Sequence, residues 1–407
     1  MKHLLWIPLL AACSKSEPPR EAPATHPSHP PAQTELDHWY RAVIGEKQGT
    51  PIPVFVDIPA SGDALMATGP DRVHAKLVSG LPNVEIEFQL NHTKIAATAL
   101  ADGSLDGTWS STSKSWGSTS LSFHATPVKG PDPALRFPGS PGPDPIGTWK
   151  VELSKPTELG KLVLSRGASP NEVVGTFSFQ TGNIAFIAGT QDGATLRMSA
   201  FDGASPYLLV GTLDHDAKAF TGSWVAGQGL DWKESLRATK VLEFKLEKPT
   251  KLATARSKLE LRELTQDAYK GHPVIVELGG SWCPACGYAA SKLRELLRAN
   301  PDLRVITLAY EFTDDPEYNK AQAAAFKAKY SIPWEVVPID GGIEKYNDIL
   351  PPEIESVDAS GFPIAIFVHR DRTIEGFHGG FPPESWGPLH VQAVSDYDAL
   401  TAKIVAK

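Results

Sequence analysis

Residues 273–286 read PVIVELGGSWCPAC, and they guide the interpretation of the last third of this 407-residue chain. The apolar run Pro273–Leu278 predicts a buried strand, and the apolar spacing after Pro284 predicts a helix over residues 284–300. Cys283 and Cys286 lie where the strand gives way to the helix. A Cys-x-x-Cys at the start of a helix, in a βαβ setting, is typical of a redox-active pair.

Alternating strands and helices continue to the end of the chain. The order indicates a mixed sheet covered by helices, in which a late hairpin and a helix follow the βαβ start. The further predicted elements are strands at residues 304–310 and 364–368, a hairpin partner at 373–377, and helices at 316–330 and 393–405.

The cysteine spacing itself favours redox chemistry. Pro284 suits the first position of a helix, and the free N–H groups and dipole of that first turn stabilise a thiolate at Cys283. Cys286 follows one helical turn later and is the expected resolving thiol. The alternatives are a static disulfide and half of a zinc site, although zinc would need two further ligands. A c-type haem attachment would need His at position 287, where Gly287 stands.

The motif GSWCPAC at Gly280–Cys286, after an apolar strand, resembles the active site of TlpA-like thioredoxin-fold proteins. The resemblance covers about residues 250–407, including residues 310–312, 361–363 and 377–381. It implies a thioredoxin-like α/β domain and a thiol-disulfide oxidoreductase that needs no cofactor beyond its cysteine pair. Client protein thiols or disulfides and a membrane or envelope redox protein are the implied partners.

The resemblance also assigns roles to residues around the pair. Pro363 matches a proline that is cis and faces the cysteines, and with Phe362 it is expected to offer backbone groups to an extended partner. Glu277 matches a buried acid beneath the resolving cysteine, with a raised pKa suited to taking its proton. The alternative is that Glu277 faces water on an edge strand. Trp282 is expected beside the sulfurs, either at the contact surface or in the core.

One departure concerns the redox direction. The family often has proline before the second cysteine, whereas here Pro284 follows the first and Ala285 precedes the second. Because the intervening residues set the reduction potential, the motif leaves reductase and oxidase both open, and a protein disulfide reductase is the preferred hypothesis.

The first residues are typical of a secretion signal. Lys2 and His3 precede an apolar run at residues 4–10, which is too short to span a bilayer, and then Ala11, Ala12 and Cys13. This resembles the bacterial lipobox and predicts a signal peptide at 1–12 and a lipidated Cys13 that anchors the protein in the cell envelope. A plain signal peptide and a chance apolar start are the alternatives.

A tether rich in Pro and Ala is predicted over residues 13–48. Its His26 and His29 fit a solvated linker better than a metal site. Two all-β domains are predicted next, at residues 49–136 and 146–248, before the thioredoxin-like domain at 250–407. The sequences at Leu105–Trp109 and Phe220–Trp224 suggest that the β domains are distant copies of one another.

The composition and the cysteine count argue against several classes of function. The net charge of −8 has no basic stripe, so nucleic acid is not an expected partner. The only three cysteines are at 13, 283 and 286, which excludes a stapling disulfide framework. A peroxiredoxin would need Pro at 276 and Thr or Ser at 280, where Val276 and Gly280 stand. A non-catalytic envelope binding protein, with a structural disulfide and partner-binding β domains, remains the alternative from a different class.

Overall fold

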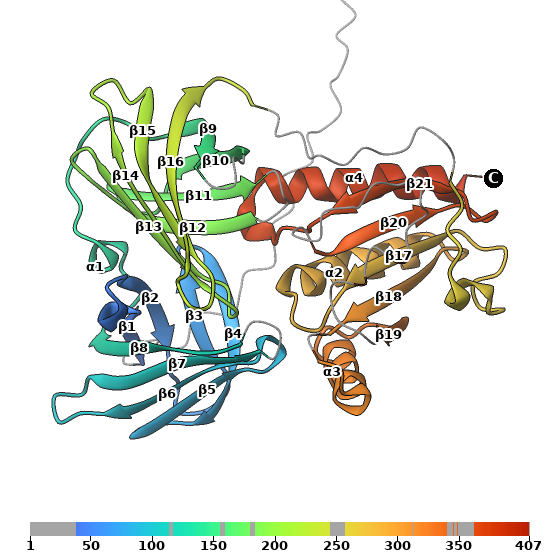
Figure 1. Cartoon of the computed structure of the whole chain (residues 1–407), viewed down its shortest axis with the longest axis horizontal. Coiled ribbons are helices and arrows are strands. Elements are labelled where there is room, and N and C mark those ends of the chain that lie inside the picture. The colour runs from blue at the N-terminus through green and yellow to red at the C-terminus, as the bar shows by residue number, and fades with distance from the viewer. Residues whose placement is uncertain are drawn as a thin grey trace, which may run out of the picture. The chain divides into compact units, whose positions relative to one another are not determined.

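The computed structural model describes most of the chain after its N-terminal segment (Figure 1). The predicted signal peptide, Cys13, and the tether up to residue 37 lie outside the described residues. The description covers residues 38–406 apart from 114–116, 155–158, 180–183, 245–256, 312, 340–344, 346–347 and 349–361.

The first β domain is a closed antiparallel barrel of eight strands. Pairing of the first strand with the eighth closes it, with Trp39 opposite Val128. The predicted tether was therefore too long, because Trp39–Ile44 within it is a largely buried strand. The strands are β1 (Trp39–Ile44), β2 (Ile52–Asp57), β3 (Ala64–Thr68), β4 (Asp71–Ser79), β5 (Asn83–Phe88), β6 (Thr93–Ala99), β7 (Leu105–Ser113) and β8 (Gly117–Val128).

The second β domain repeats this architecture. A short helix, α1 (Pro133–Arg136), comes between the two domains in the sequence. Pairing of the second barrel's last strand with its first closes it, with Ala238 opposite Val151. The strands are β9 (Gly147–Leu153), β10 (Leu159–Arg166), β11 (Glu172–Phe179), β12 (Ile184–Asp192), β13 (Thr195–Phe201), β14 (Pro206–Leu213), β15 (Ala219–Ala226) and β16 (Trp232–Val241).

The repeat predicted from the sequence corresponds to equivalent strands. β7 and β15 are each the seventh strand of their barrel, and Trp109 and Trp224 on them are buried. Gly107 and Gly222 lie two residues before these tryptophans, and a Cβ on either would come within 2.1 Å of a carbonyl oxygen on the preceding strand. A side chain is excluded at both positions for the same physical reason, which supports a common origin of the two barrels.

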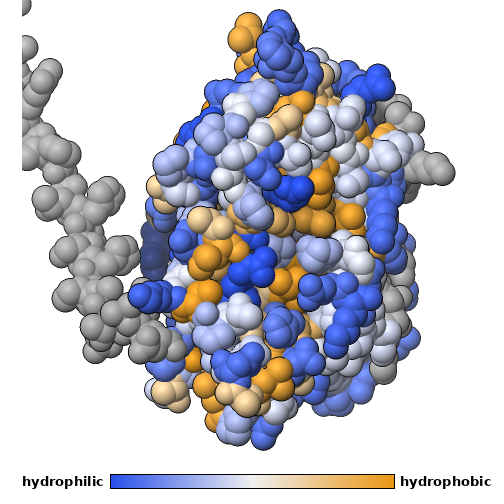
Figure 2. Space-filling view, turned by 90° about the vertical axis from the view of Figure 1, so that its left-hand side faces the viewer, coloured by the Kyte–Doolittle hydropathy of each residue, from blue (hydrophilic) through white to orange (hydrophobic). Residues whose placement is uncertain are grey.

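Apolar side chains fill the interiors of both barrels. Trp149, Phe177 and Trp224 are among the buried aromatics of the second barrel. On the face that Figure 2 shows, apolar side chains lie in small groups between polar ones, as is normal for a protein surface. Within the described residues, no three His, Cys, Asp or Glu side chains gather as ligands for a metal ion.

In its described residues, the C-terminal domain is a five-stranded mixed sheet with three α-helices. The strand order is β19-β18-β17-β20-β21. Strands β17, β18 and β19 are parallel to one another, and β20 is antiparallel to both of its neighbours, β17 and β21. The elements are β17 (Val274–Gly279), α2 (Pro284–Ala299), β18 (Arg304–Tyr310), α3 (Pro316–Lys329), β19 (Glu335–Ile339), β20 (Ile364–Val368), β21 (Ile374–Gly379) and α4 (Pro388–Val405).

These elements agree closely with the predicted ones. The strands at 304–310 and 364–368 are confirmed, whereas β19 was not predicted and α4 begins five residues before the expected helix. β17 lies at the centre of the sheet and is buried along its whole length. None of the helices in the described part of the chain is long and apolar enough to cross a membrane.

Candidate functional site

The cysteine pair lies at the N-terminus of α2. Cys283 is the N-cap residue, and its Sγ accepts a hydrogen bond from the N–H of Cys286 at 3.1 Å. Pro284 occupies the first turn, where a missing N–H costs nothing. The two sulfurs form a disulfide, with an S–S distance of 2.19 Å and a Cα–Cα distance of 5.4 Å. The predicted strand–helix junction therefore holds both sulfurs where the helix dipole favours a thiolate at Cys283.

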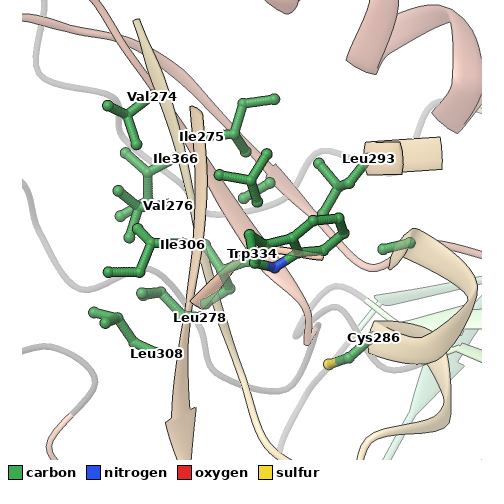
Figure 3. Close-up of a cluster of buried hydrophobic side chains, with 14 of the residues drawn as sticks. Val274, Ile275, Val276, Leu278, Cys286, Leu293, Ile306, Leu308, Trp334 and Ile366 are labelled. Carbon is green, nitrogen blue, oxygen red and sulfur yellow. The ribbon is translucent and has the colours of Figure 1, made fainter. Parts of the chain in front are cut away.

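Burial distinguishes the two cysteines. Cys286 is fully buried, whereas Cys283 retains 3% of its surface exposed. Figure 3 shows Cys286 on the same side of the sheet as Leu293 and Trp334. A Cβ on Gly279 would lie 2.7 Å from the Sγ of Cys286, so this glycine makes room for the inner sulfur at the end of β17. Of the two sulfur-bearing residues, Cys283 is therefore the one that keeps some exposed surface.

Glu277 lies two residues before Gly279 and therefore faces the same side of β17 as the sulfur of Cys286. It is fully buried on the central strand, which excludes the alternative that it faces water at an edge. Its Oε2 accepts a hydrogen bond from the Thr307 hydroxyl at 2.6 Å, and that hydroxyl accepts one from Trp334 Nε1 at 2.9 Å. Its Oε1 has no hydrogen-bond partner among the described residues.

Burial raises the pKa of Glu277 from 4.5 to about 7, and the hydrogen bond from Thr307 opposes part of that rise. A carboxyl group whose pKa lies near neutrality can both accept and release a proton at physiological pH. Glu277 is thus a buried acid on the same face of the sheet as the inner sulfur, and burial brings its pKa near neutrality; its part in proton transfer stays a prediction.

The peptide bond between Phe362 and Pro363 is cis, as the resemblance implied. The carbonyl oxygen of Pro363 accepts a hydrogen bond from the N–H of Gly380 at 2.8 Å. Because proline has no N–H of its own, the expectation that Phe362 and Pro363 offer backbone groups to a partner depends on Phe362, and it stays a prediction.

Trp282 and Phe362 lie next to each other beside the pair. The Trp282 and Phe362 rings pack edge to face, with centroids 5.5 Å apart. Trp282 Nε1 donates to the carbonyl oxygen of Tyr310 at 2.8 Å, which fixes the ring. Trp282 is only partly buried, so it belongs to both the core and the surface beside the cysteines.

Sequence reasoning missed a second buried acid. Glu311 is fully buried and accepts hydrogen bonds from the N–H and the hydroxyl of Ser281, at 2.9 and 2.8 Å. Burial raises its pKa, and the two bonds from Ser281 oppose that rise. Glu311 thereby fixes the turn that leads into Cys283. The signal available in the sequence was a charged residue directly after the apolar strand at residues 304–310.

A βαβ unit with an antiparallel hairpin and a final helix, a cysteine pair at the first helix of that unit, and a cis-proline before β20 together define the domain. It has a thioredoxin-like fold. Comparison by sequence finds no matching protein family and no matching curated protein. Comparison by structure finds thiol-disulfide proteins at low similarity.

Three of these structures show how limited the similarity is. A putative thiol:disulfide interchange protein DsbE from Chlorobium tepidum has 14% identity and a TM-score of 0.26, over 34% of this chain and 82% of that chain. A secreted disulfide oxidoreductase from Mycobacterium tuberculosis has 19% identity and a TM-score of 0.23, over 33% and 83%. StoA from Bacillus subtilis has 16% identity and a TM-score of 0.23, over 32% and 84%. These likenesses are too slight to transfer any activity.

Proposed function

We propose that this protein is an extracytoplasmic thiol-disulfide oxidoreductase that reduces disulfides in client proteins through Cys283 and Cys286. The observation that carries the proposal is the disulfide at the N-terminus of α2, with the pKa of the buried Glu277 raised to about 7 on the same face of the sheet. A purely structural disulfide needs neither the helix N-terminus nor an acid in the core, where burying a carboxyl group is costly.

The reaction begins with the reduced pair. The Cys283 thiolate attacks one sulfur of the client disulfide, forming a mixed disulfide and releasing the other client sulfur as a thiolate. Glu277 then takes the proton of the Cys286 thiol. The Cys286 thiolate attacks Cys283 Sγ, so the Cys283–Cys286 bond forms and the bond to the client breaks. Two electrons pass to the client, whose thiolates take protons from solvent, and a dithiol donor of the envelope restores the reduced pair.

Other parts of the chain are proposed to anchor the protein and to contact the client. Lipidation at Cys13 would hold the protein at the membrane, and the exposed edge of Trp282 beside Phe362 would face the apolar part of a client segment. The TlpA-like character and the choice of reduction over oxidation belong to the proposal as well. We assign the barrels no activity.

Single-cysteine variants test the mechanism. We expect Cys283→Ser to abolish exchange with a small disulfide, because no nucleophile remains at the helix N-terminus. We expect Cys286→Ser to accumulate mixed disulfides with clients, because resolution is lost. Non-reducing gel electrophoresis after acid quenching measures both outcomes. Equal residual turnover in the two variants contradicts the assigned roles and favours a structural disulfide in a binding protein.

A further inference from the structure

The proton that Glu277 takes from Cys286 must leave again in every cycle, and Glu277 is fully buried. Its Oε2 is held by Thr307, which in turn is held by Trp334. Oε2 is therefore bonded to side chains of the core and, within the residues that the structure describes, has no route to solvent through them. The Oε1 atom is the one left for proton exchange, since it has no hydrogen-bond partner among the described residues.

Strand register places a histidine on the same face as Glu277, two strands away. Glu277 lies opposite Ala365 on β20, and Ala365 lies opposite His378 on β21. Paired residues on neighbouring strands share a face, and two strand spacings are about 10 Å. Only the methyl group of Ala365 stands between the carboxyl and the imidazole in this row.

Tyr397 of α4 covers this row. Its ring packs against His378, with centroids 5.0 Å apart, and against Phe367 of β20 at 5.4 Å. Its hydroxyl is fully buried and has no hydrogen-bond partner in the described part of the chain. Burial and then the charge of Glu277 raise the pKa of Tyr397, which places the phenol within electrostatic reach of the carboxylate. Approach of the phenol to Oε1 would satisfy two buried polar atoms at once.

The other end of the row reaches solvent. His378 Nε2 lies 3.5 Å from Asp396 Oδ2, and the side chains are 16% and 43% exposed. A phenol that stays neutral can accept a proton with one lone pair and release its own, and an imidazole can do the same with its two nitrogens. Each of these groups between the core and the surface can therefore both accept and donate a proton.

We propose that Tyr397 and His378 relay the proton of Glu277 to and from solvent, with Asp396 at the outer end. The inference rests on the proposed redox function and adds two positioning residues to it. In the resolving step the Cys286 proton moves to Glu277. In the following deprotonation step, Tyr397 accepts this proton from Glu277 and passes its own hydroxyl proton to His378. No electron moves in the deprotonation step.

The other charged and titratable groups around this face are engaged elsewhere. Lys292 of α2 pairs with Asp398 and Glu295, at 2.7 and 3.0 Å. Glu375 of β21 pairs with His369 and Lys403, both at 3.0 Å. His390 of α4 lies 2.9 Å from the carbonyl oxygen of Pro382 through its Nδ1.

Stopped-flow kinetics on the full-length protein test the relay. The reduced protein is mixed with oxidised glutathione between about pH 6 and pH 9, and intrinsic tryptophan fluorescence follows closure of the pair. We expect Tyr397→Phe and His378→Gln to slow formation of the Cys283–Cys286 disulfide by at least about tenfold below pH 7. In that range Glu277 is mostly protonated and must lose its proton before it can accept the one from Cys286. The equilibrium potential should stay near the wild-type value, and the solvent deuterium isotope effect should rise.

Thr401→Val is the matched control, because Thr401 is one turn further along α4 and its hydroxyl is also buried without a partner among the described residues. We expect this variant to match the wild type. Asp396→Asn, at an exposed position, gives a milder slowing and serves if either core variant fails to fold. Wild-type rates and isotope effects in Tyr397→Phe, His378→Gln and Asp396→Asn overturn the relay. A wild-type protein that does not exchange overturns the proposed function instead, so the two failures are distinguishable.

Discussion

Replacing Glu277 with glutamine removes a titration that the core of the C-terminal sheet is expected to show near neutrality. The pKa of Glu277 is about 7 in the folded protein and 4.5 for an ordinary glutamate. The difference, about 7 minus 4.5, corresponds to about 3 kcal/mol. Because the folded-state pKa is raised, the stabilising contribution of the protonated acid is complete below about pH 4.5 and is lost as the pH rises through about 7.

The assay is calorimetric unfolding of the oxidised protein at pH values between about 4.5 and 8.5. The C-terminal domain is recognised by the transition that moves when the disulfide is reduced. We expect the wild-type domain to lose about 3 kcal/mol more of its unfolding free energy over this range than Glu277→Gln does. Glu384→Gln, an exposed position in the same domain, should follow the wild type. Parallel pH profiles for wild type and Glu277→Gln would refute the raised pKa.

Two further substitutions test the surroundings of the pair. Gly279→Ala puts a Cβ 2.7 Å from Cys286 Sγ, so we expect a loss of about 1–3 kcal/mol in the oxidised form and less in the reduced form, where the thiol can rotate. Since about 1.4 kcal/mol corresponds to 30 mV, the difference between the two losses should raise the reduction potential by up to about 60 mV; an unchanged potential would contradict the packing argument. Thr307→Val removes the hydroxyl that bonds both Glu277 and Trp334, so it should cost about 2 kcal/mol in unfolding free energy. It should also raise the pKa of Glu277 further, which moves the pH dependence of exchange to higher pH, whereas a shift to lower pH would show that Thr307 does not stabilise the carboxylate.

The parts of the fold that depend on local sequence pattern could be predicted from the sequence. The apolar runs at 304–310 and 364–368 are interior strands with the predicted bounds. The cysteine pair and Pro284 marked the start of α2 because the helix N-terminus has its own chemistry. β19 was missed because this edge strand is short, its sequence, EVVPI, contains proline, and its side chains are at most partly buried.

Features that depend on long-range pairing could not be predicted. β1 lies in a stretch that resembled a tether, and it becomes a strand because it pairs with the next strand, β2, and with β8, which is distant in the sequence. The proximity of His378 to Glu277 likewise follows from the order β17-β20-β21 and from the register through Ala365. No spacing in the sequence encodes either, whereas Glu277 itself could be found from its distance to the first cysteine.

A redox titration of Cys283 and Cys286 tests the central claim most directly. The purified protein is equilibrated with a graded dithiol buffer, and the thiols are counted after alkylation. We predict a two-electron equilibrium with a potential between about −270 and −120 mV, close to −270 mV if the protein is a reductase. A pair that stays oxidised without equilibrating would contradict the claim and make the disulfide a structural one.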